Sequence, residues 1–259
     1  MSRIESAFKE KAFVAFLTAG DPSMEKSEEY IGRLIDGGAD VIEIGIPFSD
    51  PIAEGPVIQS ANVRALRNGA NLSKVFELVK NVRKKYKETP IVFLTYLNPV
   101  YKYGAENFFK KCSEIGADGI IVPDMPFEER GEISEAAEKY GIDIVPLIAP
   151  TSEDRIKLIS QVAQGYIYIV SSMGVTGMRS EIKTDIASIV ETVRKYSDKP
   201  TAVGFGINKP EQATKYSAIA DGVIVGSAIV KIIERLGENA GDELYNYAKE
   251  MKEACLKAE

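Results

Sequence analysis

The sequence predicts a single α/β domain over residues 1–259, folded as a (β/α)₈ barrel (a TIM barrel) with an extra N-terminal helix and extended loops after the second and sixth strands. Eight short apolar runs alternate with longer amphipathic runs, which is typical of parallel strands joined by helices. The length of 259 residues fits one such barrel. Neither a linker nor a low-complexity tract indicates a second domain.

The predicted strands are short and nearly continuous in apolar residues, as expected where helices cover one face and packed side chains fill the other. Right-handed crossovers would place them in one parallel sheet, and eight such units favour a closed barrel over an open sheet. The strands are expected at residues 12–18, 40–46, 90–96, 118–124, 142–148, 166–172, 201–207 and 221–227.

Helical patterns lie between these strands. Residues 28–38 carry an apolar face and end on two glycines, residues 71–86 begin with a capping Asn or Ser, and residues 151–163 repeat the same periodicity. A short motif also recurs where helices lead into strands. It reads Gly-Ala-Asp at 38–40 and 116–118 and Ala-Asp-Gly at 220–222.

Composition excludes several kinds of chemistry. The chain contains no histidine, so a Ser-His or Cys-His nucleophile and a His-ligated zinc site are impossible. The net charge of −6 and the absence of a basic run argue against nucleic acid as a partner. Cys112 and Cys255 are expected to be buried, reduced thiols. With neither a secretory signal nor an apolar run long enough to span a bilayer, a cytoplasmic enzyme is expected.

Glu43 is the sharpest chemical feature, because it interrupts the apolar strand 40–46. Alternation places it on the face opposite Ile42 and Ile44, so its carboxyl is expected to point into the barrel. Burial of a carboxylate costs several kcal/mol unless it is paired or protonated. Glu43 is therefore either a structural carboxyl satisfied by hydroxyls or a general acid-base group with a raised pKa, and its position favours the second interpretation.

Glycines at the ends of the last two strands suggest a phosphate site. Gly204-Phe205-Gly206 ends one strand, and Gly226-Ser227 ends the next and leads into an amphipathic helix. Backbone N–H groups at this place form the common phosphate cradle of such barrels. Alternatively, the glycines serve only to make tight turns.

Apolar and aromatic residues at the same ends of the strands could line a flat slot, although several could equally be ordinary core. A phosphate cradle, an apolar slot and one buried carboxyl suit a substrate with an aromatic head and a phosphate tail. No lysine lies in a strand, which argues against a Schiff base, and no spacing of carboxylates compels a metal site. The slot candidates are Phe16, Leu94, Tyr96, Ile121, Leu147, Tyr168 and Phe205.

Motifs along nearly the whole chain resemble the tryptophan synthase alpha chain family. The most specific is EIGIPFSDPIAEGPVIQ at 43–59. The others follow in the family's order: FLTAGDP (16–22), TYLNPVY (95–101), DMPFEE (124–129), YIVSSMGVTG (168–177), VGFGI (203–207) and VGSAIV (225–230).

The resemblance implies cleavage of indole-3-glycerol phosphate into indole and glyceraldehyde 3-phosphate. It makes Glu43 the general acid and base, with Tyr168 beside it, and Thr176 part of a lid over the site. The matching phosphate-binding positions are Gly177, Gly206, Gly226 and Ser227, and the matching indole-slot positions are Phe16, Leu94 and Phe205.

One position departs from the family pattern. Where the family usually has a second catalytic aspartate, this sequence has Glu54, so the carboxyl lies one methylene further from the backbone. The family works as an alpha-beta-beta-alpha heterotetramer with a beta chain that carries pyridoxal phosphate. By resemblance, the loops at 47–56 and 98–101 face that partner, and no cofactor or metal is expected in this chain.

Three other interpretations stay open. The chain could be a free-standing indole-3-glycerol-phosphate lyase, which would turn over fully without a partner. It could be a catalytically weak allosteric subunit, an idea that only Glu54 supports. It could also be another phosphosugar barrel, such as an epimerase or isomerase, although the 43–59 segment argues against that.

Overall fold

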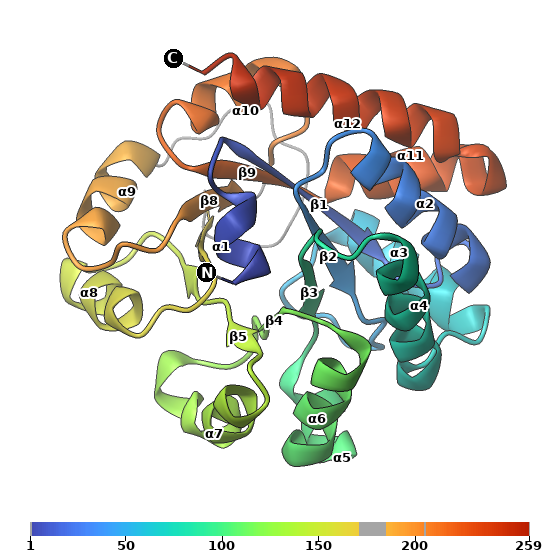
Figure 1. Cartoon of the computed structure of the whole chain (residues 1–259), viewed down its shortest axis with the longest axis horizontal. Helices are drawn as coiled ribbons and strands as arrows, with labels where there is room; N and C mark the ends of the chain where they lie inside the picture. The colour runs from blue at the N-terminus through green and yellow to red at the C-terminus, as the bar shows by residue number, and fades with distance from the viewer. Residues whose placement is uncertain (1, 171–184, 205, 259) are drawn as a thin grey trace.

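The computed structural model describes residues 2–170, 185–204 and 206–258, and it confirms the predicted barrel. Within these residues, nine parallel strands pair in the order β5-β4-β3-β2-β1-β9-β8-β7-β6. Figure 1 looks along the barrel, with the outer helices arranged around the strands and the N-terminal helix α1 in front of them. The strands are β1 Ala12–Thr18, β2 Val41–Gly45, β3 Ile91–Leu94, β4 Gly119–Ile121, β5 Asp143–Ile144, β6 Leu147–Ile148, β7 Ile167–Val170, β8 Thr201–Gly204 and β9 Gly222–Val225.

The count of nine arises because the fifth predicted strand is interrupted. Residues 142–148 form β5 and β6, separated by Val145 and Pro146, and proline has no N–H for the ladder. The pairing nevertheless continues through the gap, since the Val145 N–H donates to the Ile120 carbonyl and the Tyr168 N–H donates to the Pro146 carbonyl. The segment therefore closes the barrel as one kinked strand.

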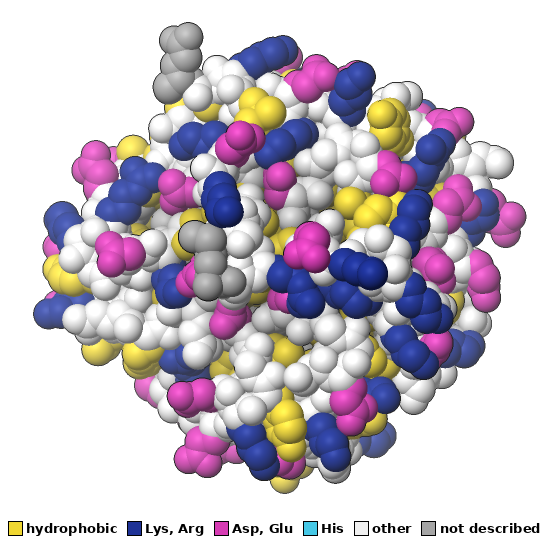
Figure 2. All heavy atoms as spheres, in the orientation of Figure 1, with side chains coloured by type: hydrophobic (Ala, Val, Ile, Leu, Met, Phe, Trp, Pro, Cys, Tyr) yellow, Lys and Arg dark blue, Asp and Glu magenta, His cyan; other side chains and the backbone are white. Residues whose placement is uncertain are grey.

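Most helices of the described residues cover the outside of the barrel, α1 covers one end of it, and none of them is long and apolar enough to cross a membrane. They are α1 Arg3–Ala7, α2 Met24–Asp36, α3 Pro56–Arg67, α4 Leu72–Lys85, α5 Leu97–Tyr103, α6 Ala105–Ile115, α7 Gly131–Lys139, α8 Glu153–Gln161, α9 Ile186–Arg194, α10 Pro210–Ser217, α11 Ser227–Leu236 and α12 Gly241–Leu256, with short 3₁₀ turns η1 Phe127–Glu129 and η2 Gly237–Asn239. Figure 2 shows acidic and basic side chains interspersed over one face.

Two segments that the sequence assigned to loops contain helices. The long connection after β2 includes α3, which begins at Pro56 with Gly55 as its N-cap, a favourable start because proline at the first helical position lacks only an N–H that would be unpaired anyway. Likewise, residues 98–101 lie within α5 rather than in a loop. The loop after β2 is therefore shorter than expected and ends on a rigid helix.

The extra N-terminal helix closes the end of the barrel where the strands begin. Ser2 and Glu5 form a reciprocal capping box at its start, and Ile4 is fully buried. Ile4 belongs to the apolar cluster inside the barrel, together with inward residues such as Val14, Val41 and Val92. Cys112 and Cys255 are buried free thiols, as predicted.

The recurring Asp of the helix-to-strand motif has one structural role at all three positions. Each carboxylate accepts a hydrogen bond from a backbone N–H at the start of a neighbouring strand, and each also pairs with a Lys or Arg. These aspartates fix the register at the end of the barrel opposite the chemistry. The N–H contacts are Asp40 with Phe13 (2.7 Å), Asp118 with Ile91 (2.8 Å) and Asp221 with Thr201 (2.8 Å).

We expect Asp118→Ala to lower the free energy of unfolding by about 2–3 kcal/mol, because it leaves the Ile91 N–H without its acceptor and removes the carboxylate partner of the half-buried Arg83. Urea unfolding measures the change. The control is Asp242→Ala, which removes a carboxylate that is 87% exposed in its pair with Arg33 and is expected to cost at most about 0.5 kcal/mol. Equal losses for the two variants would contradict a structural role of the motif.

Candidate active site

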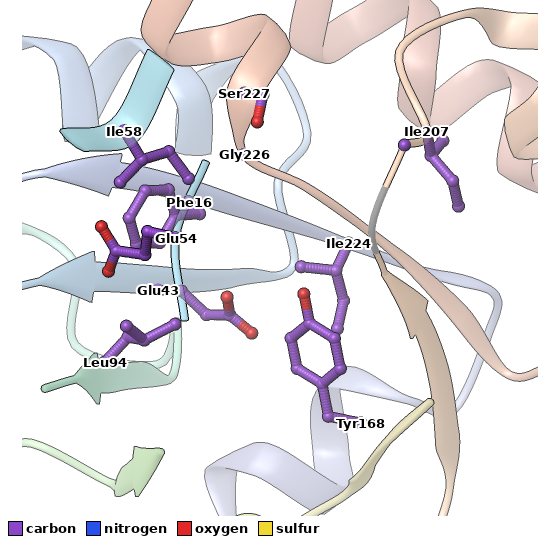
Figure 3. A pocket seen from close by; sticks show the side chains of 11 residues that line it. Phe16, Glu43, Glu54, Ile58, Leu94, Tyr168, Ile207, Ile224, Gly226 and Ser227 are labelled. Carbon is purple, nitrogen blue, oxygen red and sulfur yellow. The ribbon is translucent and has the colours of Figure 1, made fainter. Parts of the chain in front are cut away.

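A cavity opens at the carboxyl ends of the strands, on the side of the barrel formed by β1, β2, β3 and β7–β9 (Figure 3). It brings together eight residues that the sequence analysis selected: Phe16, Glu43, Glu54, Leu94, Tyr168, Gly206, Gly226 and Ser227. Ile58, Ile207 and Ile224 complete the lining. Ile58 lies in the first turn of α3, and its closeness in sequence to Glu54 was the signal that could have identified it.

Glu43 points into the barrel because it pairs with the inward residues Phe16 on β1 and Val92 on β3. Its exposed fraction is 1%. Burial among apolar side chains raises the pKa of Glu43 to about 7, although a hydrogen bond from the Tyr166 hydroxyl to its Oε1 opposes this shift. At neutral pH the group can therefore both give and take a proton.

The contact with Tyr166 was missed in the sequence analysis. Tyr166 and Tyr168 share one face of the β7 segment by alternation, but only Tyr168 lies near the end of the strand, where the chemistry was expected. Burial and the nearby Glu43 raise the pKa of both tyrosines well above the usual value, so both stay protonated. Figure 3 shows the Tyr168 hydroxyl and the Glu43 carboxyl turned toward one another.

Glu54 lies at the end of the loop after β2, directly before the N-cap of α3. It is 5% exposed, and burial raises its pKa to about 7, opposed by hydrogen bonds with Asn62 and Tyr96. The Asn62 amide donates to Glu54 Oε2 at 2.8 Å, and the Gln59 amide donates to the Glu54 carbonyl at 2.7 Å. The cavity thus holds two carboxyl groups that can carry a proton at neutral pH.

The opposite end of the cavity is made of backbone. β9 ends at Val225, and α11 begins at Ser227 without a side-chain cap on its first turn. Uncapped N–H groups at a helix start bind anions. The glycines are also needed for the chain itself, since Gly206 has a φ of +91° and a Cβ on Gly226 would lie 3.1 Å from the Phe16 ring.

Three expected slot residues do not line this cavity. The Tyr96 hydroxyl accepts from the Ala53 N–H at 3.2 Å and its ring stacks on Phe48, so Tyr96 supports the loop that carries Glu54. Ile121 on β4 and Leu147 on β6 pack with the interior cluster, on the side of the barrel away from β1 and β9. Alternation predicts that a residue faces inward but does not say which side of the barrel mouth it occupies.

Thr176, Gly177 and Phe205 lie outside the described residues. In the described part of the chain, Cys, Asp and Glu side chains do not gather in groups of three that could hold a metal ion.

Comparison with known proteins agrees with this geometry. The family model described as tryptophan synthase alpha chain matches residues 3–256. Two tryptophan synthase alpha chains are close relatives: that of Lacticaseibacillus casei is 47% identical over 98% of this chain and 96% of its own length, and that of Methanocaldococcus jannaschii is 50% identical over 89% and 82%.

Solved structures give the same result. The tryptophan synthase alpha chain of Legionella pneumophila superposes with a TM-score of 0.89 at 35% identity, covering 98% of this chain and 97% of that one. A chain of the tryptophan synthase complex of Pyrococcus furiosus gives 0.87 at 38% identity, covering 94% and 98%. With a family model and relatives spanning nearly its whole length, the chain belongs to the tryptophan synthase alpha chain family.

Proposed function

We propose that this chain is the alpha subunit of a tryptophan synthase and that it cleaves indole-3-glycerol phosphate to indole and glyceraldehyde 3-phosphate. The observation that carries the proposal is Glu43, a buried carboxyl with a pKa near 7 that faces an apolar cavity. Membership of the family argues against another type of phosphosugar barrel.

The cleavage needs a proton donor and a proton acceptor in turn. Protonated Glu43 gives its proton to C3 of the indole, which becomes an electrophilic indolenine. The resulting carboxylate takes the proton of the side-chain hydroxyl next to the ring. The carbon–carbon bond then breaks, its electron pair restores the indole, and the hydroxyl carbon becomes the aldehyde. A carboxyl with a pKa near the working pH suits both transfers.

The other cavity residues bind and orient the substrate. We assign Glu54 to the indole N–H, where a carboxylate stabilises the positive charge that develops on the ring. Phe16 and Leu94 pack against the indole, together with Phe205. The phosphate lies at the start of α11, on the backbone of Gly206 and Gly226 and the hydroxyl of Ser227, with Gly177 as a further contact. Tyr168 orients Glu43, and Thr176 belongs to the lid.

Indole passes to a beta chain in an alpha-beta-beta-alpha tetramer, and the tryptophan synthase of Pyrococcus furiosus is an α2β2 complex of this kind. Two large apolar residues, Ile52 on the loop after β2 and Tyr101 on α5, are 72% and 78% exposed. Both lie in segments that by resemblance face the beta chain, and contact with that chain would bury their exposed apolar side chains. We place pyridoxal phosphate in the beta chain only, and the assembly in the cytoplasm.

The direct test is indole release from indole-3-glycerol phosphate by the purified chain, alone and with a beta chain. Release that rises several-fold with the partner supports the alpha-subunit function. Full turnover by the chain alone indicates a free-standing lyase. Absence of release in both conditions contradicts the proposal.

We expect Glu43→Gln to lower kcat by at least ~10²-fold, because the amide can neither donate nor accept the transferred proton. The assay is indole release with the beta chain present, and circular dichroism checks that the barrel is retained. If the variant keeps most of its rate, Glu43 is not the acid-base group. If its own turnover is lost and it still activates the beta chain normally, the two functions of the chain are separable.

The pH dependence tests the role of Tyr166. Glu43 must start protonated, so kcat is expected to fall as pH rises through its pKa. The Tyr166 hydroxyl lowers this pKa by stabilising the carboxylate. In Tyr166→Phe the protonated form of Glu43 persists to higher pH, so the alkaline limb of the kcat–pH profile should move to higher pH.

The matched control is Tyr216→Phe, which removes the hydroxyl of another buried tyrosine, in α10 and away from the cavity, and should leave the limb unchanged. A limb that stays in place, or moves to lower pH, in Tyr166→Phe would contradict this assignment.

A further inference from the structure

The side chain of Asn62, near the middle of α3, lies between the two ends of the loop that carries Glu54. It is 4% exposed and makes three hydrogen bonds. Its Oδ1 accepts from the Phe48 N–H at 2.9 Å, and its Nδ2 donates to Glu54 Oε2 at 2.8 Å and to the Ile58 carbonyl at 2.9 Å. One amide therefore joins the start of the loop, just after β2, to the acid at its end.

These contacts leave the amide only one orientation. The Phe48 N–H requires an acceptor, so Oδ1 must face the loop backbone, and the NH₂ group must then face Glu54. Aspartate could still accept from Phe48 but would place a second carboxylate against Glu54. Alanine would lose all three contacts.

We propose that Asn62 is a positioning residue that orients the Glu54 carboxyl toward the indole and stabilises its ionised form during cleavage. This inference rests on the proposed function and deepens it. Figure 3 shows the Glu54 carboxyl on the side of Phe16 and Ile58, turned away from Tyr168. Asn62 and Tyr96 both bond the Glu54 carboxylate, and its other lone pairs are left for the indole N–H.

The groups that face Glu54 come from several elements. Asn62 faces it from α3 and Tyr96 from the segment after β3, while Glu43 on β2 and Tyr168 on β7 line the same cavity. Asp124, after β4, acts on Tyr96. Both Asn62 and Tyr96 lower the pKa of Glu54 against the effect of burial, so removal of the Asn62 donor raises this pKa.

The test is indole release by Asn62→Ala and Asn62→Asp with the beta chain present, measured across pH. We expect kcat to fall roughly tenfold to a hundredfold with a smaller change in KM, as for the loss of a hydrogen bond to a charged group. The acidic limb of kcat should move to higher pH, further in Asn62→Asp than in Asn62→Ala.

A double-mutant cycle separates positioning from general damage. In a Glu54→Gln background, Asn62→Ala should cost little more, because the carboxyl that it holds is already gone. Additive losses, or an unmoved acidic limb, would overturn the proposal. Asn68→Ala is the matched control, since this exposed asparagine caps the end of the same helix and bonds the Pro22 carbonyl; its kinetics should be unchanged.

Gln59→Ala gives a second comparison, because Gln59 holds the backbone of Glu54 rather than its carboxyl. Gln59→Ala can lower the rate but should leave the acidic limb of kcat in place, and a limb that moves as far as in Asn62→Ala contradicts a specific role of Asn62.

Titration of the Glu54 carboxyl by ¹³C NMR, assigned with Glu54→Gln, needs no substrate. If the wild type releases no indole but Asn62→Ala raises the pKa of Glu54, the proposed function fails and the Asn62–Glu54 contact stands. If the pKa of Glu54 is unchanged in Asn62→Ala, the contact itself is rejected.

Discussion

The site depends on the cost of burying the Glu43 carboxyl. A carboxylate in an apolar interior loses the hydration that stabilises its charge, and the neutral acid becomes the favoured form. In this barrel the main compensating contact is a neutral hydroxyl, that of Tyr166, which opposes the shift only in part. The pKa therefore rises to about 7. If Glu43 were solvated or paired with a cation, it would be a permanent carboxylate and a poor proton donor.

The remaining architecture separates stability from chemistry. At the end where strands begin, three aspartates accept hydrogen bonds from backbone N–H groups of neighbouring strands, and Ile4 packs into the interior of the barrel. At the other end, polar groups are few and each has a specific place. Glu43 stands on a strand, whereas Glu54 stands on a loop that Asn62, Gln59 and Tyr96 fix to helix α3 and the β3 segment. One acid is held by the sheet and the other by a helix, so their separation depends on the loop between them.

Much of this follows from the sequence, because alternation and periodicity are local. Eight apolar runs predicted the barrel, and the position of Glu43 between Ile42 and Ile44 predicted that it faces inward. Three features were not predictable from these local patterns. Pro146 splits one strand without opening the barrel. The NPVY segment at 98–101 is helical, although the resemblance implied a loop there. Tyr96, Ile121 and Leu147 do not line the cavity: Tyr96 contacts the loop that carries Glu54, and the side of the barrel mouth that Ile121 and Leu147 occupy is set by strand order rather than by alternation.

The most direct measurement is the protonation state of Glu43 itself. Infrared difference spectra of the wild type and Glu43→Gln, recorded across pH, isolate the carbonyl band of this one protonated carboxyl. We expect the band to persist through mildly acidic pH and to disappear with a midpoint near pH 7. A midpoint near the ordinary glutamate value of about 4.3 would mean that Glu43 is a carboxylate at neutral pH, and it would contradict burial as the origin of the chemistry.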